Sequence, residues 1–167
     1  SIIGVMISTK SREVNYWDQP LIKNKNMAFA GFIVKKINLT THYLVRYSLE
    51  PGLKFGGLSC TVNTSNVNNY RKNDNLSFKS KFILRNFFFR KRKYAVKYDT
   101  IQSDEGGRFY QSQIRNMVIQ LKDQQKVKID NNYKWISQNQ MIYLIKRGVL
   151  DIEARLLFAC YNFNKIN

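Results

Sequence analysis

The 167-residue sequence contains only two cysteines, two prolines and one histidine. Cys60 and Cys160 are too few for a disulfide scaffold, and with a single histidine they form no zinc-binding pattern. We therefore expect two free thiols in a reducing cytoplasm. No uninterrupted apolar run reaches a length of about 18 residues, which a membrane-spanning helix needs. The apolar first residues lack the basic leader and cleavage site of a secretory signal.

Acidic residues are also scarce. The chain has 11 Asp and Glu against 28 Lys and Arg, a formal net charge of +17 with the histidine neutral. One dense basic cluster stands out at residues 90–93, and the other lysines are scattered among 18 asparagines. We interpret most of this charge as the result of codon bias, carried by lysines and arginines on a solvated surface. A basic cleft for a small anion such as a nucleotide diphosphate is the second interpretation, and nucleic-acid binding the third.

Common nucleotide-enzyme motifs are missing as well. No glycine-rich loop ends in Gly-Lys-Ser/Thr, so there is no phosphate loop, and no GxGxxG follows a strand, so a Rossmann dinucleotide site is not supported. There is no Gly-x-Ser-x-Gly elbow, and nothing near His42 supports a Ser-His-acid triad.

What the sequence does contain is enough apolar material for one globular domain over residues 1–167. Residues 29–37 and 41–49 flank a polar turn and predict a β-hairpin. In the second of these segments, Tyr43 and Val45 alternate with Leu44 and Arg46. We interpret residues 11–21 as a loop or strand edge, because they contain Trp17 and Pro20. Further strands are predicted at residues 1–7, 58–64, 94–102 and 114–121.

The hydrophobic period changes after Trp135. Residues 137–147 predict a helix with Ser137 as N-cap and Gly148 as C-terminal stop, and residues 151–162 predict a second helix. Residues 81–89 are apolar without a clean period, so helix and strand both remain open. A strand-rich front and a helical end indicate an α+β domain with a mixed β-sheet and C-terminal helices.

The segment most suggestive of chemistry is residues 102–110, where two glycines lie among acidic, basic and aromatic residues at a strand end. One interpretation is a site where backbone approaches a ligand closely, flanked by carboxylate and guanidinium groups. The other is a tight surface turn in which Arg108 pairs with Asp104.

Residues 102–121 resemble the signature of the NDP-sugar 2,3-dehydratases, written Gln-Ser-Glu-Glu-Gly-Gly-Arg-Phe followed by Arg-Asn and an apolar strand. Residues 11–22, 42–52 and 135–160 resemble three further family segments in the same order. Asp104 replaces the first signature glutamate, and residues 60–63 replace Pro-Thr-Val-Gln. Family members are similar to tandem proteins with two Nudix-like halves. The resemblance therefore implies one Nudix-like half whose first part lies outside this chain.

The resemblance also implies an activity. The family removes the 2-hydroxyl as water from an NDP-4-keto-6-deoxyhexose, giving a 3,4-diketo-2,6-dideoxy sugar in bacterial deoxysugar biosynthesis. No redox cofactor and no metal are implied. The residues expected to act as acid or base are Glu105, then Tyr110 and His42. The residues expected to bind the sugar nucleotide are Arg108, Arg115, Trp17, Asn63, Asn66 and Tyr70.

An alternative stays open: a non-catalytic nucleotide-sugar binding or assembly module on the same fold. We also expect a homodimer in which exposed aromatics of residues 87–89 cover the surface that a second half would occupy. We expect no membrane partner, and nucleic acid is the least favoured partner.

Overall fold

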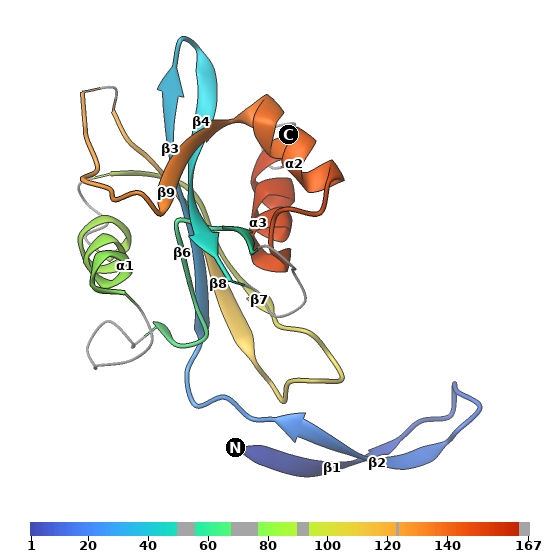
Figure 1. Ribbon diagram of the computed structural model, residues 1–167. Helices are drawn as coiled ribbons and strands as arrows, with labels where there is room; N and C mark the ends of the chain where they lie inside the picture. Colours follow the sequence, from blue (N-terminus) through green and yellow to red (C-terminus); the bar gives the residue numbers. More distant parts are fainter. Residues whose placement is uncertain (50–55, 68–76, 90–93, 123, 164–167) are drawn as a thin grey trace.

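The computed structural model describes residues 1–49, 56–67, 77–89, 94–122 and 124–163. Within them it contains a two-stranded sheet, a seven-stranded sheet, and helices on both faces of the larger sheet (Figure 1). The elements in chain order are β1 (Ile2–Ser8), β2 (Tyr16–Ile22), β3 (Ala28–Ile37), β4 (Thr40–Ser48), β5 (Gly57–Ser59), β6 (Val62–Thr64), α1 (Phe78–Ile83), the π-helix η2 (Leu84–Phe88), β7 (Ala95–Ser103), β8 (Gln113–Gln120), β9 (Tyr133–Ser137), α2 (Gln138–Lys146) and α3 (Ile152–Phe163).

The large sheet is mixed. Its order is β5-β4-β3-β8-β7, with β6 paired to β3 and β9 paired to β4. Only the β3–β8 pair is parallel, and the other pairs are antiparallel. Central β3 is buried from Ala28 to Val34, as expected for a strand covered on both faces.

Helices divide the core into two parts. Ala30, Phe32 and Tyr43 face α2 and α3, whereas Phe29 and Leu44 face α1 and η2. Figure 1 shows α1 on one side of the sheet and α2 and α3 on the other. The predicted alternation in β4 is therefore confirmed, and so is the α+β class with a mixed sheet and C-terminal helices.

The sheet forks between β3 and β4. The two strands pair from Ile33 to Ile37, and below Ile33 the short strands β5 and β6 occupy the widening gap. Thr61, between β5 and β6, joins both arms of the fork. Its hydroxyl accepts a hydrogen bond from Ile33 N at 2.9 Å and donates one to the carbonyl of Leu44.

The C-terminal helices follow the sequence prediction. Ser137 caps α2 in a capping box, in which its hydroxyl accepts from Gln140 N and the Gln140 side chain accepts from Ser137 N. The turn after α2 contains Gly148 at φ 67°, a left-handed conformation that glycine adopts without a Cβ penalty. Asp151 caps α3 by accepting from Ala154 N at 2.8 Å.

The structure decides two open expectations and revises one. Of the loop and strand-edge alternatives, the second holds for residues 16–22, and Pro20 is tolerated because it lies in an exposed two-stranded sheet opposite Gly4. The single strand expected at residues 58–64 is two strands, because it crosses the fork. The open segment 81–89 is helical, the α1–η2 unit.

The expectation of exposed aromatics at residues 87–89 is wrong. Phe87 is 7% exposed and Phe88 is fully buried, where its ring packs edge-to-face on Phe29 at 5.1 Å. These aromatics are core because η2 lies on the sheet with its apolar side inward. The basic cluster at residues 90–93 lies outside the described residues. Among the described helices, none is long and apolar enough to cross a membrane.

Candidate functional site

The signature residues form the loop that connects β7 to β8. Asp104 closes the base of this loop: Asp104 N donates to Ser112 O at 2.9 Å, and Ser112 Oγ donates to Asp104 Oδ2 at 3.2 Å. The other carboxylate oxygen accepts from Glu105 N at 2.9 Å. Gly107 has φ 81°, where a side chain would be strained. Asp104 is therefore occupied in shaping the loop.

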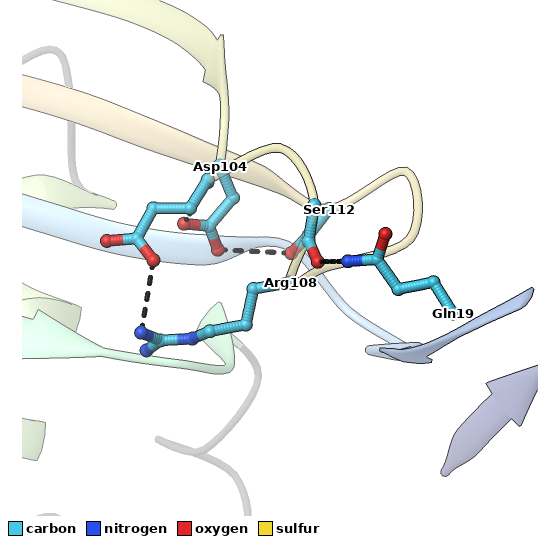
Figure 2. A network of polar contacts seen from close by, with 6 residues as sticks. Gln19, Asp104, Arg108 and Ser112 are labelled. Carbon is cyan, nitrogen blue, oxygen red and sulfur yellow. Dashed lines mark hydrogen bonds and ion pairs between the residues drawn. The ribbon is translucent and has the colours of Figure 1, made fainter. Parts of the chain in front are cut away.

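The β1–β2 hairpin holds the other side of the same loop. Gln19 donates from Nε2 to the carbonyl of Gly107 (Figure 2). Ile22 N donates to Arg108 O, and Tyr110 N donates to Ile22 O, both at 2.9 Å. The loop that carries the signature therefore lies between the large sheet and the projecting hairpin (Figure 1).

Glu105 and Arg108 form the ion pair of this loop. Arg108 Nη1 lies 3.1 Å from Glu105 Oε2, and the two side chains are 65% and 46% exposed, respectively. Asp104 is not the partner, so the expected Asp104–Arg108 pair is replaced by an i,i+3 pair. Because both groups are accessible, each can exchange its present partner for a ligand.

A cavity of about 390 Å³ lies beside this pair, between the loop, the fork of the sheet and the start of α3. It contains carboxylates, guanidinium groups, amides and hydroxyls, and its volume falls in the ordinary range for small-molecule sites. Among the described residues, it is lined by Asn24, Ala28, Arg46, Ser48, Asn63, Thr64, Ser65, Asp104, Glu105, Arg108, Phe109, Ile114 and Glu153.

Three of the predicted site residues meet in this cavity: Glu105, Arg108 and Asn63. Trp17 and Tyr110 lie next to the site without lining it. The Trp17 indole donates to Gln19 Oε1 at 3.0 Å, and the Tyr110 ring lies 5.5 Å from Lys23 Nζ. Trp17 therefore contacts Gln19, which holds the signature loop, whereas Tyr110 lies against the neighbouring Lys23.

Other predicted residues lie elsewhere. His42 is near the β3–β4 turn, four residues or about 13 Å along β4 from Arg46. Arg115 makes a bidentate pair with Asp99 at 2.7 Å, and these bonds raise the pKa of the guanidinium. Asn66 N donates to Thr64 Oγ1 at 3.3 Å, and Asn66 is outside the cavity lining.

Tyr70 falls outside the described residues, so its predicted role in stacking on the base stays a prediction.

Two charged cavity residues, Arg46 and Glu153, were missed by sequence reasoning. From the sequence, Arg46 was only assigned to one side of a strand. The pattern that could have identified it is a charged residue on the same side of the strand as the apolar Leu44. Glu153 was interpreted only as an acidic residue in the first turn of a helix. Both reach the cavity through the fold, because β4 and α3 converge at the fork.

Two larger hollows exist among the described residues. One of about 540 Å³ lies at the other end of the sheet beside Lys36 and Lys97, and one of about 640 Å³ lies in the hairpin beside Trp17. Neither contains Glu105 or Arg108. We select the cavity beside the signature loop because it combines acid–base groups with cations.

The chain is similar to three curated relatives. Proteins named dTDP-4-dehydro-6-deoxy-alpha-D-glucopyranose 2,3-dehydratase align over 163 residues each. Those from Saccharopolyspora spinosa and Streptomyces violaceoruber are 29% identical, covering 95% of this chain and 32% and 35% of the relatives. The one from Amycolatopsis orientalis is 27% identical, covering 96% and 33%. The chain thus spans about a third of the length of these relatives.

A solved structure, the Ap4A hydrolase of C. elegans, is 14% identical with a TM-score of 0.42, covering 75% of this chain and 85% of that one. The Nudix-like assignment of the fold stays a prediction. The family profile described as NDP-hexose 2,3-dehydratase matches residues 1–161. The match includes the signature loop, the fork and the start of α3, and the chain therefore belongs to the NDP-hexose 2,3-dehydratase family.

Proposed function

We propose that this chain takes part in removing water from an NDP-4-keto-6-deoxyhexose, as a lyase of deoxysugar biosynthesis. The observation that carries the proposal is the meeting of Glu105, Arg108 and Asn63 in one cavity. The relatives act on a dTDP-linked 4-keto sugar by their names, and we extend that substrate class to this chain.

The reaction needs a base, an acid and charge stabilisation. The 4-keto group acidifies the hydrogen on carbon 3, and a base takes that proton to leave an enolate. The electron pair then expels the 2-hydroxyl, which leaves as water after accepting a proton. The enol product tautomerises to a 3,4-diketo sugar, so no electrons leave the substrate.

Glu105 is our candidate for the proton transfers, because its carboxylate is accessible at the cavity and is held by the loop rather than buried in the core. Arg108, 3.1 Å away, is suited to stabilise the enolate oxygen as negative charge develops there. Asn63 extends from β6 and can donate to sugar or phosphate oxygens.

Incubation of the chain with dTDP-4-keto-6-deoxyglucose, followed by mass spectrometry, tests the proposal. We expect loss of one water from the substrate. Glu105→Gln should lower the rate about 10²–10⁴-fold and leave dTDP affinity nearly unchanged, because the amide keeps the shape but cannot take a proton. Arg108→Ala should lower rate and affinity together, since it removes a charge-assisted contact. Parental turnover by Glu105→Gln would move the acid–base role to Tyr110 or His42.

The competing candidate is a binding module without turnover, and it is favoured by one observation: the carboxylate of Glu105, the candidate acid–base group, is engaged in an ion pair with Arg108. A module of this kind binds dTDP-4-keto-6-deoxyglucose and releases it unchanged. Binding by calorimetry without any loss of water would therefore replace the enzyme proposal with this one.

We also propose a homodimer and a cytoplasmic location. The β1–β2 hairpin exposes apolar side chains on one face, with Ile2 76%, Met6 74% and Tyr16 59% exposed, which favours association. Free Cys60 and Cys160 suit a reducing compartment. Sedimentation at micromolar concentration tests the dimer, and a monomer only would contradict it. Met6→Lys should shift a dimer toward monomer.

A further inference from the structure

Three buried polar atoms in the described part of the chain have no hydrogen-bond partner: Arg46 Nε, Ser59 Oγ and Asp151 Oδ2. They belong to adjoining segments, because Arg46 is the register partner of Ser59 and Asp151 N donates to Leu58 O at 3.0 Å. A buried polar atom without a hydrogen-bond partner lowers the stability of the fold, and three such atoms on adjoining segments call for an explanation.

Arg46 is the member of this group that lines the cavity. Its side chain is partly buried and always charged, because a guanidinium does not lose its proton in proteins. Within the described residues it makes no ion pair. The two arginines that the sequence predicted to bind substrate already have carboxylate partners: Arg108 pairs with Glu105, and Arg115 pairs with Asp99.

The backbone fixes Arg46 more firmly than Arg108. Arg46 lies on β4 with strand partners on both sides, Ser59 of β5 and Tyr133 of β9. Arg108 lies on an exposed loop. A group held by a sheet keeps its position when a ligand enters, which lowers the entropic cost of binding. The neighbouring Ser48 hydroxyl and Asn63 amide line the same cavity and can donate to oxygen atoms.

We infer that Arg46 binds the diphosphate group of the ligand in this cavity, which rests on the proposed function for the choice of a nucleotide-linked sugar. The planar guanidinium fork matches two phosphate oxygens, and Arg46 presents this group where it lines the cavity. In the sheet order, β3 and β8 lie between β4 and β7. Arg46 and the β7–β8 loop therefore enter the cavity from different strands. With the diphosphate bound at Arg46, Glu105 on the loop is free to act on the sugar.

Titration calorimetry with dTDP, and with thymidine as a probe that lacks phosphate, tests the inference. Arg46→Gln should weaken dTDP binding about 10–100-fold and leave thymidine binding unchanged, as expected for loss of a charge-assisted contact. The dTDP affinity of Arg46→Lys should lie between those of the parent and Arg46→Gln, because lysine keeps the charge and loses the planar guanidinium. Arg147→Gln is the matched control, because Arg147 lies over the Tyr143 ring outside the cavity, and its dTDP affinity should equal that of the parent.

A measurement on the unmutated chain guards against misfolded variants. Phenylglyoxal, which modifies arginine, should react with Arg46 more slowly when dTDP is present, while modification of Arg147 outside the cavity stays constant. Peptide mass mapping gives both rates. Equal modification of Arg46 with and without dTDP, or parental affinity in a folded Arg46→Gln variant, overturns the inference.

The two proposals fail separately. Turnover of dTDP-4-keto-6-deoxyglucose together with unchanged dTDP affinity in Arg46→Gln removes the role of Arg46 and keeps the dehydratase. dTDP binding that depends on Arg46, without turnover of the 4-keto sugar, keeps the role of Arg46 and removes the dehydratase. Failure of the parent chain to bind dTDP at millimolar concentration overturns the inference as well.

Discussion

Replacing Thr61 by valine should lower the free energy of unfolding by about 3 kcal/mol. The hydroxyl is fully buried and serves both arms of the fork, accepting from Ile33 N and donating to Leu44 O. Valine fills the same volume, so the arms cannot close on each other, and one backbone donor and one acceptor lose their partner. Each buried unsatisfied group costs about 1–3 kcal/mol.

Thr61→Ser is the matched control. It keeps the hydroxyl and removes one methyl group, which should cost about 1 kcal/mol. Urea unfolding followed by circular dichroism should give three midpoints in the order parent, serine variant, valine variant, with equal slopes because the exposed surface is unchanged. The melting temperature of the valine variant should fall by about 6–12 °C. A valine variant within about 0.5 kcal/mol of the parent would refute the role of the hydroxyl.

Three further predictions concern the site and the core. Gln19→Ala should lower kcat for dehydration and leave the melting temperature almost unchanged, because Gln19 holds the exposed carbonyl of Gly107; unaltered kcat would contradict a positioning role. Burial raises the pKa of the Tyr43 phenol above its ordinary value of 10.0, so the unfolded chain loses this proton first. Stability is then full below about pH 10 and declines as pH rises above it, with a shallower decline in Tyr43→Phe when urea midpoints are compared. Cys60 is fully buried with a raised thiol pKa, so a thiol reagent should label Cys160 in the native chain and both cysteines in denaturant; equal native rates would contradict this.

The elements that the sequence predicts well are those whose signals are local. The capping box of α2 spans residues 137–140, and the stop at Gly148 depends on that glycine alone. The β3–β4 hairpin depends on a short turn in which Asn38 and Leu39 both adopt positive φ. In each case the residues that determine the structure lie within a few positions of one another, so a pattern along the chain records them.

The features that escaped prediction depend on contacts between distant segments. Residues 58–64 alternate like one strand, and only the divergence of β3 from β4 divides them at Thr61. The segment around Trp17 contains a proline, which left loop and strand edge both open, and pairing with β1 over the full length of β2 decides for the strand. The burial of Phe88 depends on Gly31, where a Cβ would lie 2.6 Å from the Phe88 ring, so this aromatic fits only because the facing strand lacks a side chain.

The candidate site shows the same division between local and distant signals. Glu105 and Arg108 could be selected because they share one short segment with two glycines. Arg46, Asn63 and Glu153 lie far from it in sequence and reach the cavity on β4, β6 and α3. Their positions are set by the fork, since β6 enters the gap that opens between β3 and β4. A substitution that narrows this gap should therefore move the proposed diphosphate contact relative to the acid–base loop. Thr61→Ala is such a substitution, because it removes the side chain that separates the two arms, and it should lose turnover beyond its loss of folded protein, measured as kcat per folded molecule at a temperature well below the melting transition.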